Sequence, residues 1–119
     1  MKSILLAGAV SLAVINPTLA ERYGSGFVDS AKLYDRCTAT PETDDDAGQN
    51  VAYCLGYLVG IFDGEEKYLC YPKDLKVGQI REAVVAYLKR NAEERRYLAY
   101  GTVVRALNQA FRCNKRGLT

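Results

Sequence analysis

Apolar residues recur between Asn50 and Cys70 at intervals of three and four positions, which is the period of an α-helix. They fall on two sides of that helix, and a helix that is apolar on two sides is expected to be covered on two sides. We therefore predict a central helix here, with the rest of the chain packed around it. One stripe consists of Val51, Leu55, Leu58, Val59 and Phe62, and the other of Tyr53, Tyr57, Ile61 and Tyr68.

Glycines recur every four residues along the same segment, at Gly56, Gly60 and Gly64. Each costs roughly 1 kcal/mol relative to alanine in a helix interior, so something is expected to offset that cost. The sequence predicts a groove in which another helix or an aromatic ring approaches the backbone. A membrane-spanning glycine motif needs about 20 apolar residues, and acidic residues from Asp63 to Glu66 interrupt this run. The segment is therefore interpreted as the central helix of a soluble bundle.

Three further helices are predicted, one before the central helix in the sequence and two after it. A short helix covers residues 31–38, with Asp29 or Ser30 as its N-cap. An amphipathic helix starts at Val77, with a charged connection over residues 91–96 behind it, and no segment alternates with period two for long enough to predict a strand. The predicted fold is all-α, a compact bundle of about four helices. The inward positions expected in the last two helices are Ile80, Val84, Tyr87 and Leu88, followed by Tyr100, Val103, Val104, Leu107 and Phe111.

The first 20 residues have the pattern of a secretory signal peptide. Lys2 supplies a positive charge, residues 4–15 form a short apolar run, and the segment ending at Ala20 offers small residues at a cleavage site. Cleavage is expected after Ala20. Because Glu21 and not cysteine follows, no lipid anchor is predicted. The mature chain is then a single domain over residues 21–119, with no membrane contact after cleavage.

Four cysteines are available, and in a small exported domain they are expected to form disulfides: Cys37, Cys54, Cys70 and Cys113. If Cys54 and Cys70 lie on one helix they are roughly 24 Å apart, beyond disulfide reach. Of the two pairings that remain, Cys37–Cys54 with Cys70–Cys113 suits a helical hairpin tied to the last helix. Zinc is not predicted, because the spacings lack paired CxxC motifs and the chain has no histidine.

Composition argues against catalysis. Without histidine the commonest general base is missing, and without tryptophan a sugar cleft would lack its usual platforms. Asp63, Glu65 and Glu66 are too close on one helix to flank a substrate. Charge is segregated, since residues 35–66 hold eight acids and one arginine whereas basic residues dominate from Lys67 onward. Nine tyrosines could include exposed anchors for a protein partner, and no nucleic-acid-binding motif is present. A binding protein without cofactor is therefore expected, not an enzyme.

Four segments together resemble the Rap1a/Tai immunity-protein family: LYDRC at 33–37, CLGYLVGIFDG at 54–64, CYPKDLKVGQIREAVVAYLKRN at 70–91 and TVVRALNQAFRC at 102–113. The resemblance implies a small periplasmic helical protein that neutralises an effector delivered by a type VI secretion system. It also implies a homodimer. Some family members plug the active-site cleft of a peptidoglycan amidase with a helix and a protruding loop, which gives the expected mechanism here.

The resemblance also implies which residues bind the effector. The helix would be Val77 to Arg90 and the loop Asn91 to Tyr97. The implied contact residues are Gln79, Glu82, Lys89 and Arg90 on the helix, and Glu93, Glu94, Arg95 and Arg96 on the loop.

Two other interpretations stay open at this point. The chain could be a different periplasmic binding module, such as an acid-stress chaperone, because those proteins can also be small, helical and tied by disulfides. A degradative enzyme is the other class, and it would depend on Glu65 or Glu66.

Overall fold

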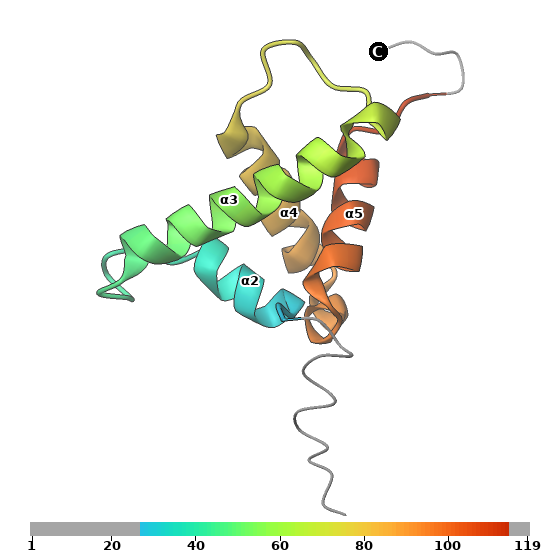
Figure 1. The fold of residues 1–119 in the computed structure, drawn as a ribbon. Helices are drawn as coiled ribbons and strands as arrows, with labels where there is room; N and C mark the ends of the chain where they lie inside the picture. The colour runs from blue at the N-terminus through green and yellow to red at the C-terminus, as the bar shows by residue number, and fades with distance from the viewer. Residues whose placement is uncertain (1–26, 115–119) are drawn as a thin grey trace, which may run out of the picture.

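The computed structural model describes residues 27–114 and confirms an all-α fold (Figure 1). In this part of the chain the only β-type contact is a single bridge between Asp29 and Leu98. The predicted signal peptide, the segment 21–26 and the last five residues lie outside the described residues. No described helix is long and apolar enough to cross a membrane. The elements are α2 (Ser30–Cys37), α3 (Ala47–Glu65), η2 (Glu66–Tyr68), α4 (Val77–Arg90), η3 (Ala92–Arg96) and α5 (Ala99–Ala110), where η marks a short 3-10 helix.

Helix α3 is the central element, as predicted. It crosses the molecule in Figure 1 and packs against α2, α4 and α5. Side chains from all four helices meet behind it in one hydrophobic core. Burial of this apolar surface is the main term that stabilises the bundle. The largest fully buried side chains are Leu33 on α2, Leu58 on α3, Val84 and Leu88 on α4, and Val103 and Leu107 on α5.

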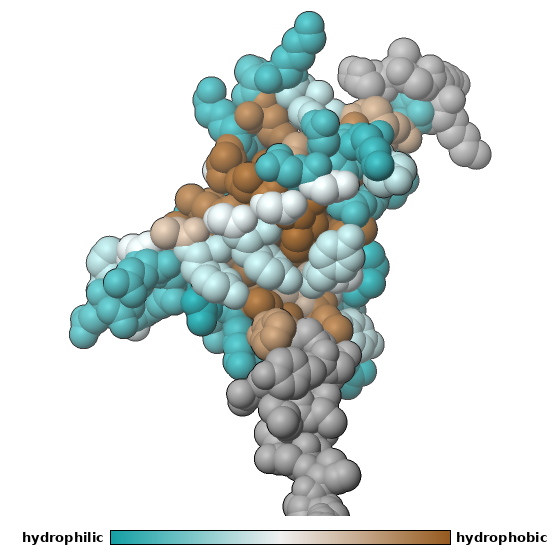
Figure 2. Space-filling view, viewed as in Figure 1, coloured by the Kyte–Doolittle hydropathy of each residue, from teal (hydrophilic) through white to brown (hydrophobic). Residues whose placement is uncertain are grey.

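The predicted two-sided burial of α3 is wrong, however. Its buried face is formed by Cys54, Leu58, Ile61 and Phe62, whereas Tyr53 is 39% exposed. Tyr68, which was predicted on the second stripe, lies beyond α3 in η2 and is 62% exposed. The three helices that contact α3 all reach it from the core side, so its other face is left open. Figure 2 shows uncovered hydrophobic surface along this side of the molecule.

The predicted glycine groove is also wrong within this chain. A Cβ atom added at Gly56, Gly60 or Gly64 would meet no other heavy atom within 4 Å outside its own helix turn. The glycines therefore lie on the open face of α3, and no helix or aromatic ring of the described chain approaches them. The helix also ends at Glu65 rather than Cys70, because the chain tightens into η2 there.

Both disulfides have the pairing that suits a helical hairpin. Cys37 joins Cys54 with a Cα–Cα distance of 5.1 Å, which ties the end of α2 to α3. Cys70 joins Cys113 at 4.9 Å, and the Cys70 N–H donates to the Phe111 carbonyl at 2.8 Å. The two covalent links therefore tie the first half of α3 to the end of α2, and the segment after η2 to the segment after α5.

One inward position in the last helix was predicted wrongly. Tyr100 is 55% exposed, while Ala99 and Thr102 are fully buried. The buried face of α5 thus begins with small residues that fit close to α2. Tyr100 instead donates its hydroxyl to Glu65 at 2.9 Å, on the surface. Elsewhere the prediction is confirmed: Val103 and Leu107 are buried, and Val104 and Phe111 pack against the core.

Candidate protein-binding site

Residues 91–97, here called the η3 loop, connect α4 to α5 close to the start of α2 (Figure 1). Asn91 ends α4, because its backbone N–H and its side-chain amide both donate to the Tyr87 carbonyl at 2.9 Å. Two short turns follow. The Glu94 N–H donates to the Asn91 carbonyl at 2.8 Å, and the Tyr97 N–H donates to the Glu94 carbonyl at 3.0 Å. The predicted charged connection is thus an ordered turn and not an extended strand of loop.

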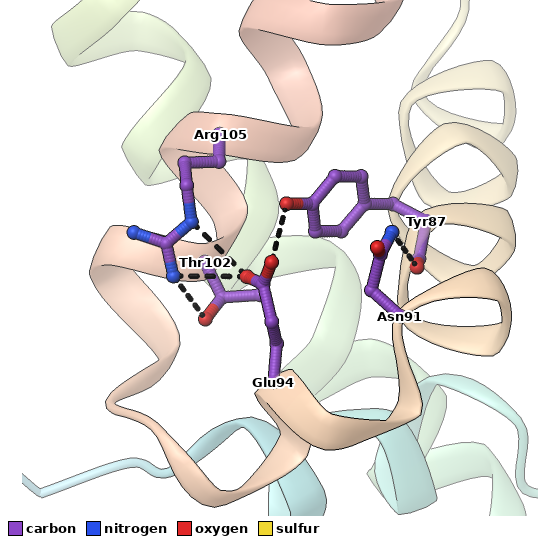
Figure 3. Close-up of polar contacts among 5 residues, drawn as sticks. All are labelled: Tyr87, Asn91, Glu94, Thr102 and Arg105. Atoms are coloured by element: carbon purple, nitrogen blue, oxygen red, sulfur yellow. Dashed lines mark hydrogen bonds and ion pairs between the residues drawn. The ribbon is translucent and has the colours of Figure 1, made fainter.

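The Glu94 carboxylate joins the η3 loop to two helices (Figure 3). One oxygen accepts hydrogen bonds from Arg105 of α5, with Nε at 3.0 Å and Nη2 at 2.9 Å. The other accepts from the Tyr87 hydroxyl of α4 at 2.8 Å. Arg105 also donates to Thr102 Oγ1 at 3.2 Å, which fixes the guanidinium on its own helix. Charge-assisted bonds of this kind hold a loop in one conformation more firmly than neutral ones.

This environment changes how the two partners of Glu94 titrate. The hydrogen bond to Glu94 raises the pKa of Arg105, so the guanidinium stays charged. Burial, together with the hydrogen bond to Glu94, raises the pKa of Tyr87. The phenol therefore remains a donor to Glu94 under all physiological conditions.

Arg95 holds the other side of the η3 loop. Its Nε donates to the Leu88 carbonyl at 3.2 Å, and its guanidinium carbon lies 3.9 Å from the centre of the Tyr34 ring on α2. A cation over an aromatic face at this distance is attractive. The backbone adds two further links between this region and the start of α2, from Ser30 N–H to Tyr97 O at 2.8 Å and from Ala99 N–H to Val28 O at 2.9 Å.

The implied effector-binding residues fall into two groups. Glu94 and Arg95 are half-buried, and their polar atoms form the hydrogen bonds that hold the loop. The other six side chains are exposed: Gln79, Glu82, Lys89, Arg90, Glu93 and Arg96.

These six are not all brought together. Gln79 lies in the first turn of α4, where its side chain accepts from the Lys76 N–H at 2.8 Å. It is therefore roughly 20 Å along the helix axis from the η3 loop at 1.5 Å per residue. Arg90 lies in the last turn of α4 and immediately precedes the loop.

A groove of about 440 Å³ runs between the end of α2 and the outer face of α4. Glu82 and Lys89 line it, together with Val85, Ala86 and Cys37. Arg81 closes one side, because its Nε and Nη2 donate to the Cys37 carbonyl at 2.9 and 2.6 Å. Two of the implied contact residues thus share this groove rather than the loop.

Two more grooves lie beside the η3 loop, and both depend on α5. One of about 630 Å³ is lined by Tyr97, Leu98 and Tyr100 with Glu94 and Arg105. The other, of about 370 Å³, lies between α4 and α5. Sequence reasoning did not link Arg105, Asn108 and Arg112 of the predicted last helix to the site. Their helical spacing could have shown that they share one face of that predicted helix. Their proximity to the loop depends on how α5 packs. The lining of the second groove is Tyr87, Val104, Arg105, Asn108, Gln109 and Arg112.

The acidic side chains at the end of α3 are used in contacts with tyrosines. Glu65 accepts from Tyr100, and Glu66 accepts from Tyr71 at 2.5 Å. These hydrogen bonds to carboxylates raise the pKa of both phenols. Within residues 27–114, no group of three or more histidine, cysteine or acidic side chains is placed to hold a metal ion.

Comparison with known proteins identifies the family. A family model described as Rap1a immunity proteins matches residues 29–113. The match begins at Asp29, the N-cap of α2 that accepts from the Lys32 N–H at 2.8 Å, and it ends at Cys113 of the second disulfide. It thus spans all four described helices. No curated protein matches the chain. Because the family model covers most of the sequence, the chain belongs to the Rap1a immunity proteins.

Proposed function

We propose that this protein is a periplasmic immunity protein that binds a peptidoglycan-amidase-like effector of a type VI secretion system and occludes its active site. Membership of the Rap1a immunity proteins is the observation that carries the proposal. Proteins of this family generally act by binding and not by catalysis. The proposed contact surface is the end of α4 and the η3 loop.

The order of the η3 loop supports occlusion as the mechanism. Glu94 and Arg95 tie the loop to α2, α4 and α5, so little conformational entropy remains to be lost when a partner binds. In this scheme Glu94 and Arg95 position the loop. Arg90, Glu93 and Arg96 are exposed around it and make the contacts.

Export is part of the proposal. Proteins of this family are typically periplasmic, and residues 1–20 have the sequence pattern of a signal peptide. Two disulfides suit the oxidising periplasm, where such bonds persist. Detection of the mature chain beginning at Glu21 in a periplasmic extract would establish export and cleavage after Ala20.

A homodimer is proposed as the working form. Light scattering combined with size-exclusion chromatography of the mature protein gives its mass directly. A monomer at all accessible concentrations would overturn the proposed homodimer without contradicting the proposed binding of the effector.

The central test requires that a secreted, amidase-like protein be found encoded beside this gene. That protein is directed to the periplasm of a host cell, with and without this chain, and lysis is followed. Rescue by the wild type, together with a stable complex of the purified proteins, is expected. A variant carrying Glu93→Arg and Arg96→Glu should lose rescue, whereas the distant Lys73→Glu should keep it. Absence of a complex when this protein is in excess would overturn the proposal. If the protein instead suppresses the aggregation of unrelated unfolded proteins, it is a chaperone.

A further inference from the structure

The groove between α4 and α5 carries an excess of positive charge. Arg105 and Arg112 of the α5 segment line it, and Arg90 of α4 reaches across to Gln109, with Nη2 at 3.3 Å from Oε1. None of the residues that line the groove is acidic. This surface, here called the α4–α5 groove, is defined by the residues that line it and Arg90.

Only one of these three arginines has a counter-charge. Arg105 is paired with Glu94, and this is the single salt bridge within the described part of the chain. Arg90 makes one hydrogen bond, to a neutral amide, and Arg112 forms no ion pair there. Two exposed guanidinium groups are thus left without a carboxylate in the described part of the chain: Arg112, which lines the groove, and Arg90, which is hydrogen-bonded to the lining residue Gln109.

The remaining lining is suited to hydrogen bonding. Asn108 and Gln109 are exposed amides, and Asn108 uses one of its donors on the Val104 carbonyl at 2.8 Å. Guanidinium groups bind carboxylates in a bidentate geometry, and arginine is enriched where protein partners dock.

We propose that the α4–α5 groove binds an acidic segment of the effector, with Arg90 and Arg112 as its carboxylate-binding residues. This proposal rests on the proposed function, since it names the chemistry of the partner surface that lies next to the η3 loop. Arg105 lines the groove and holds the η3 loop through its bond to Glu94. The acidic stretch of residues 42–46 of a second copy is the competing occupant.

The first experiment measures the recognition of carboxylates alone. Fluorescein-labelled hexaglutamate is titrated with the full mature protein, and its anisotropy is followed in about 20 mM and about 200 mM salt, because exposed ion pairs weaken as the ionic strength rises. Saturable binding is expected in low salt. Hexaglutamine of the same length is the control probe. Equal binding of the two peptides, or no saturable binding of hexaglutamate, would overturn the proposal.

Matched variants locate the binding. Arg90→Gln with Arg112→Gln removes two charges from the groove, and Lys32→Gln with Lys73→Gln removes two exposed charges elsewhere. The groove variant is expected to raise the Kd for hexaglutamate by about tenfold, as expected for loss of two charge-assisted contacts, and the control by less than about threefold. Circular dichroism confirms that both variants fold. Equal effects of the two variants would contradict the assignment.

The same variants separate this inference from the proposed function. If the wild type fails to bind the secreted protein encoded beside its gene, the proposed function fails whatever hexaglutamate does. If the groove variant loses hexaglutamate but still rescues cells and binds that protein, the acidic segment of the effector is excluded. Loss of self-association by the groove variant, with the effector complex intact, would assign the groove to the second copy and overturn the proposal.

Discussion

Arg105 of α5 binds Glu94 of the η3 loop through two guanidinium nitrogens, with Nε at 3.0 Å and Nη2 at 2.9 Å from one carboxylate oxygen. The side chain of Glu94 is 16% exposed and that of Arg105 is 50% exposed. The pair therefore lies at the edge of solvent, where it can order the loop without the desolvation cost of a deeply buried pair.

Replacing Glu94 by glutamine is expected to loosen the η3 loop. The variant loses the ionic bond to Arg105 and weakens the acceptor of the Tyr87 hydroxyl. Because Arg105 is half exposed and screened by water, the expected loss in the free energy of unfolding is only about 1 kcal/mol, measured by urea denaturation. Hydrogen exchange of the backbone amides of residues 92–96 should rise as well.

The exposed neighbour Glu93 provides the control for that prediction. No hydrogen bond of the described residues involves its side chain, so Glu93→Gln should leave both stability and exchange unchanged. If the two variants behave alike, Glu94 does not hold the loop in place.

Stability is expected to fall at alkaline pH, in part through Tyr87. Burial and the hydrogen bond to Glu94 raise the pKa of Tyr87 above its ordinary value of 10.0. A group whose folded pKa is raised contributes stability that is fully present below its unfolded pKa and is lost as the pH rises toward the folded one. The free energy of unfolding should therefore decrease above about pH 10.

Tyr87→Phe tests the origin of that decrease. The variant lacks the titrating phenol, so the slope of stability against pH above about 10 should be shallower than in the wild type. Tyr57, whose pKa burial also raises, contributes to the remaining slope. Urea midpoints measured between about pH 8 and pH 11 give the comparison. An unchanged slope would show that Tyr87 titrates alike in both states.

Much of the fold followed from the sequence because the helical period was strong there. Helix α4 begins at Val77, as its apolar spacing predicted, and Asp29 caps α2. For the disulfides, the expected length of the central helix excluded one of three pairings, and the choice between the other two depended on the expected helical hairpin. The prediction for α3 failed because periodicity shows that two faces are apolar but does not show whether neighbours are available to cover both. The prediction that Tyr100 points inward failed for a related reason. Ala99 and Thr102 form the buried face at the start of α5, where the helix packs closely against α2.

The candidate site was less accessible to sequence reasoning. The resemblance indicated the η3 loop, but nothing in the pattern separated Glu94 and Arg95, which hold the loop, from Arg96, which is exposed on it. The contribution of α5 could not be predicted, because Arg105 meets Glu94 only once two helices are packed.

The two disulfides are expected to differ in how readily they are reduced. Cys37 and Cys54 are 1% and 0% exposed, whereas Cys113 is exposed at the surface. A thiolate reagent must reach a sulfur atom, so Cys70–Cys113 should open first. Limited reduction with dithiothreitol, followed by alkylation and mass spectrometry, identifies the bond. Modification of Cys37 before Cys113 would contradict the buried position of the first bond.

Loss of the longer disulfide should also destabilise the bundle more. Its cysteines are separated by 43 residues, against 17 for Cys37–Cys54. In the chain-entropy model the two bonds contribute about 4 and about 3 kcal/mol, respectively. Paired Cys→Ser variants of each bond, compared by urea denaturation, give the two values. A larger loss on removing the buried Cys37–Cys54 bond would show that core packing around it outweighs the entropy of the unfolded chain.

The open face of α3 gives a prediction about Gly60. A Cβ added there meets nothing within 4 Å, so Gly60→Ala should stabilise the isolated chain by about 0.5–1 kcal/mol through helix propensity alone. Gly56→Ala should act in the same way, because a Cβ added there also meets nothing within 4 Å. Unfolding is best measured at two protein concentrations that differ by about a hundredfold, since a self-association contact stabilises only the concentrated sample. Stabilisation at the lower concentration with loss of stability at the higher one would mean that a second copy covers this face. Destabilisation at both would contradict the open environment of Gly60.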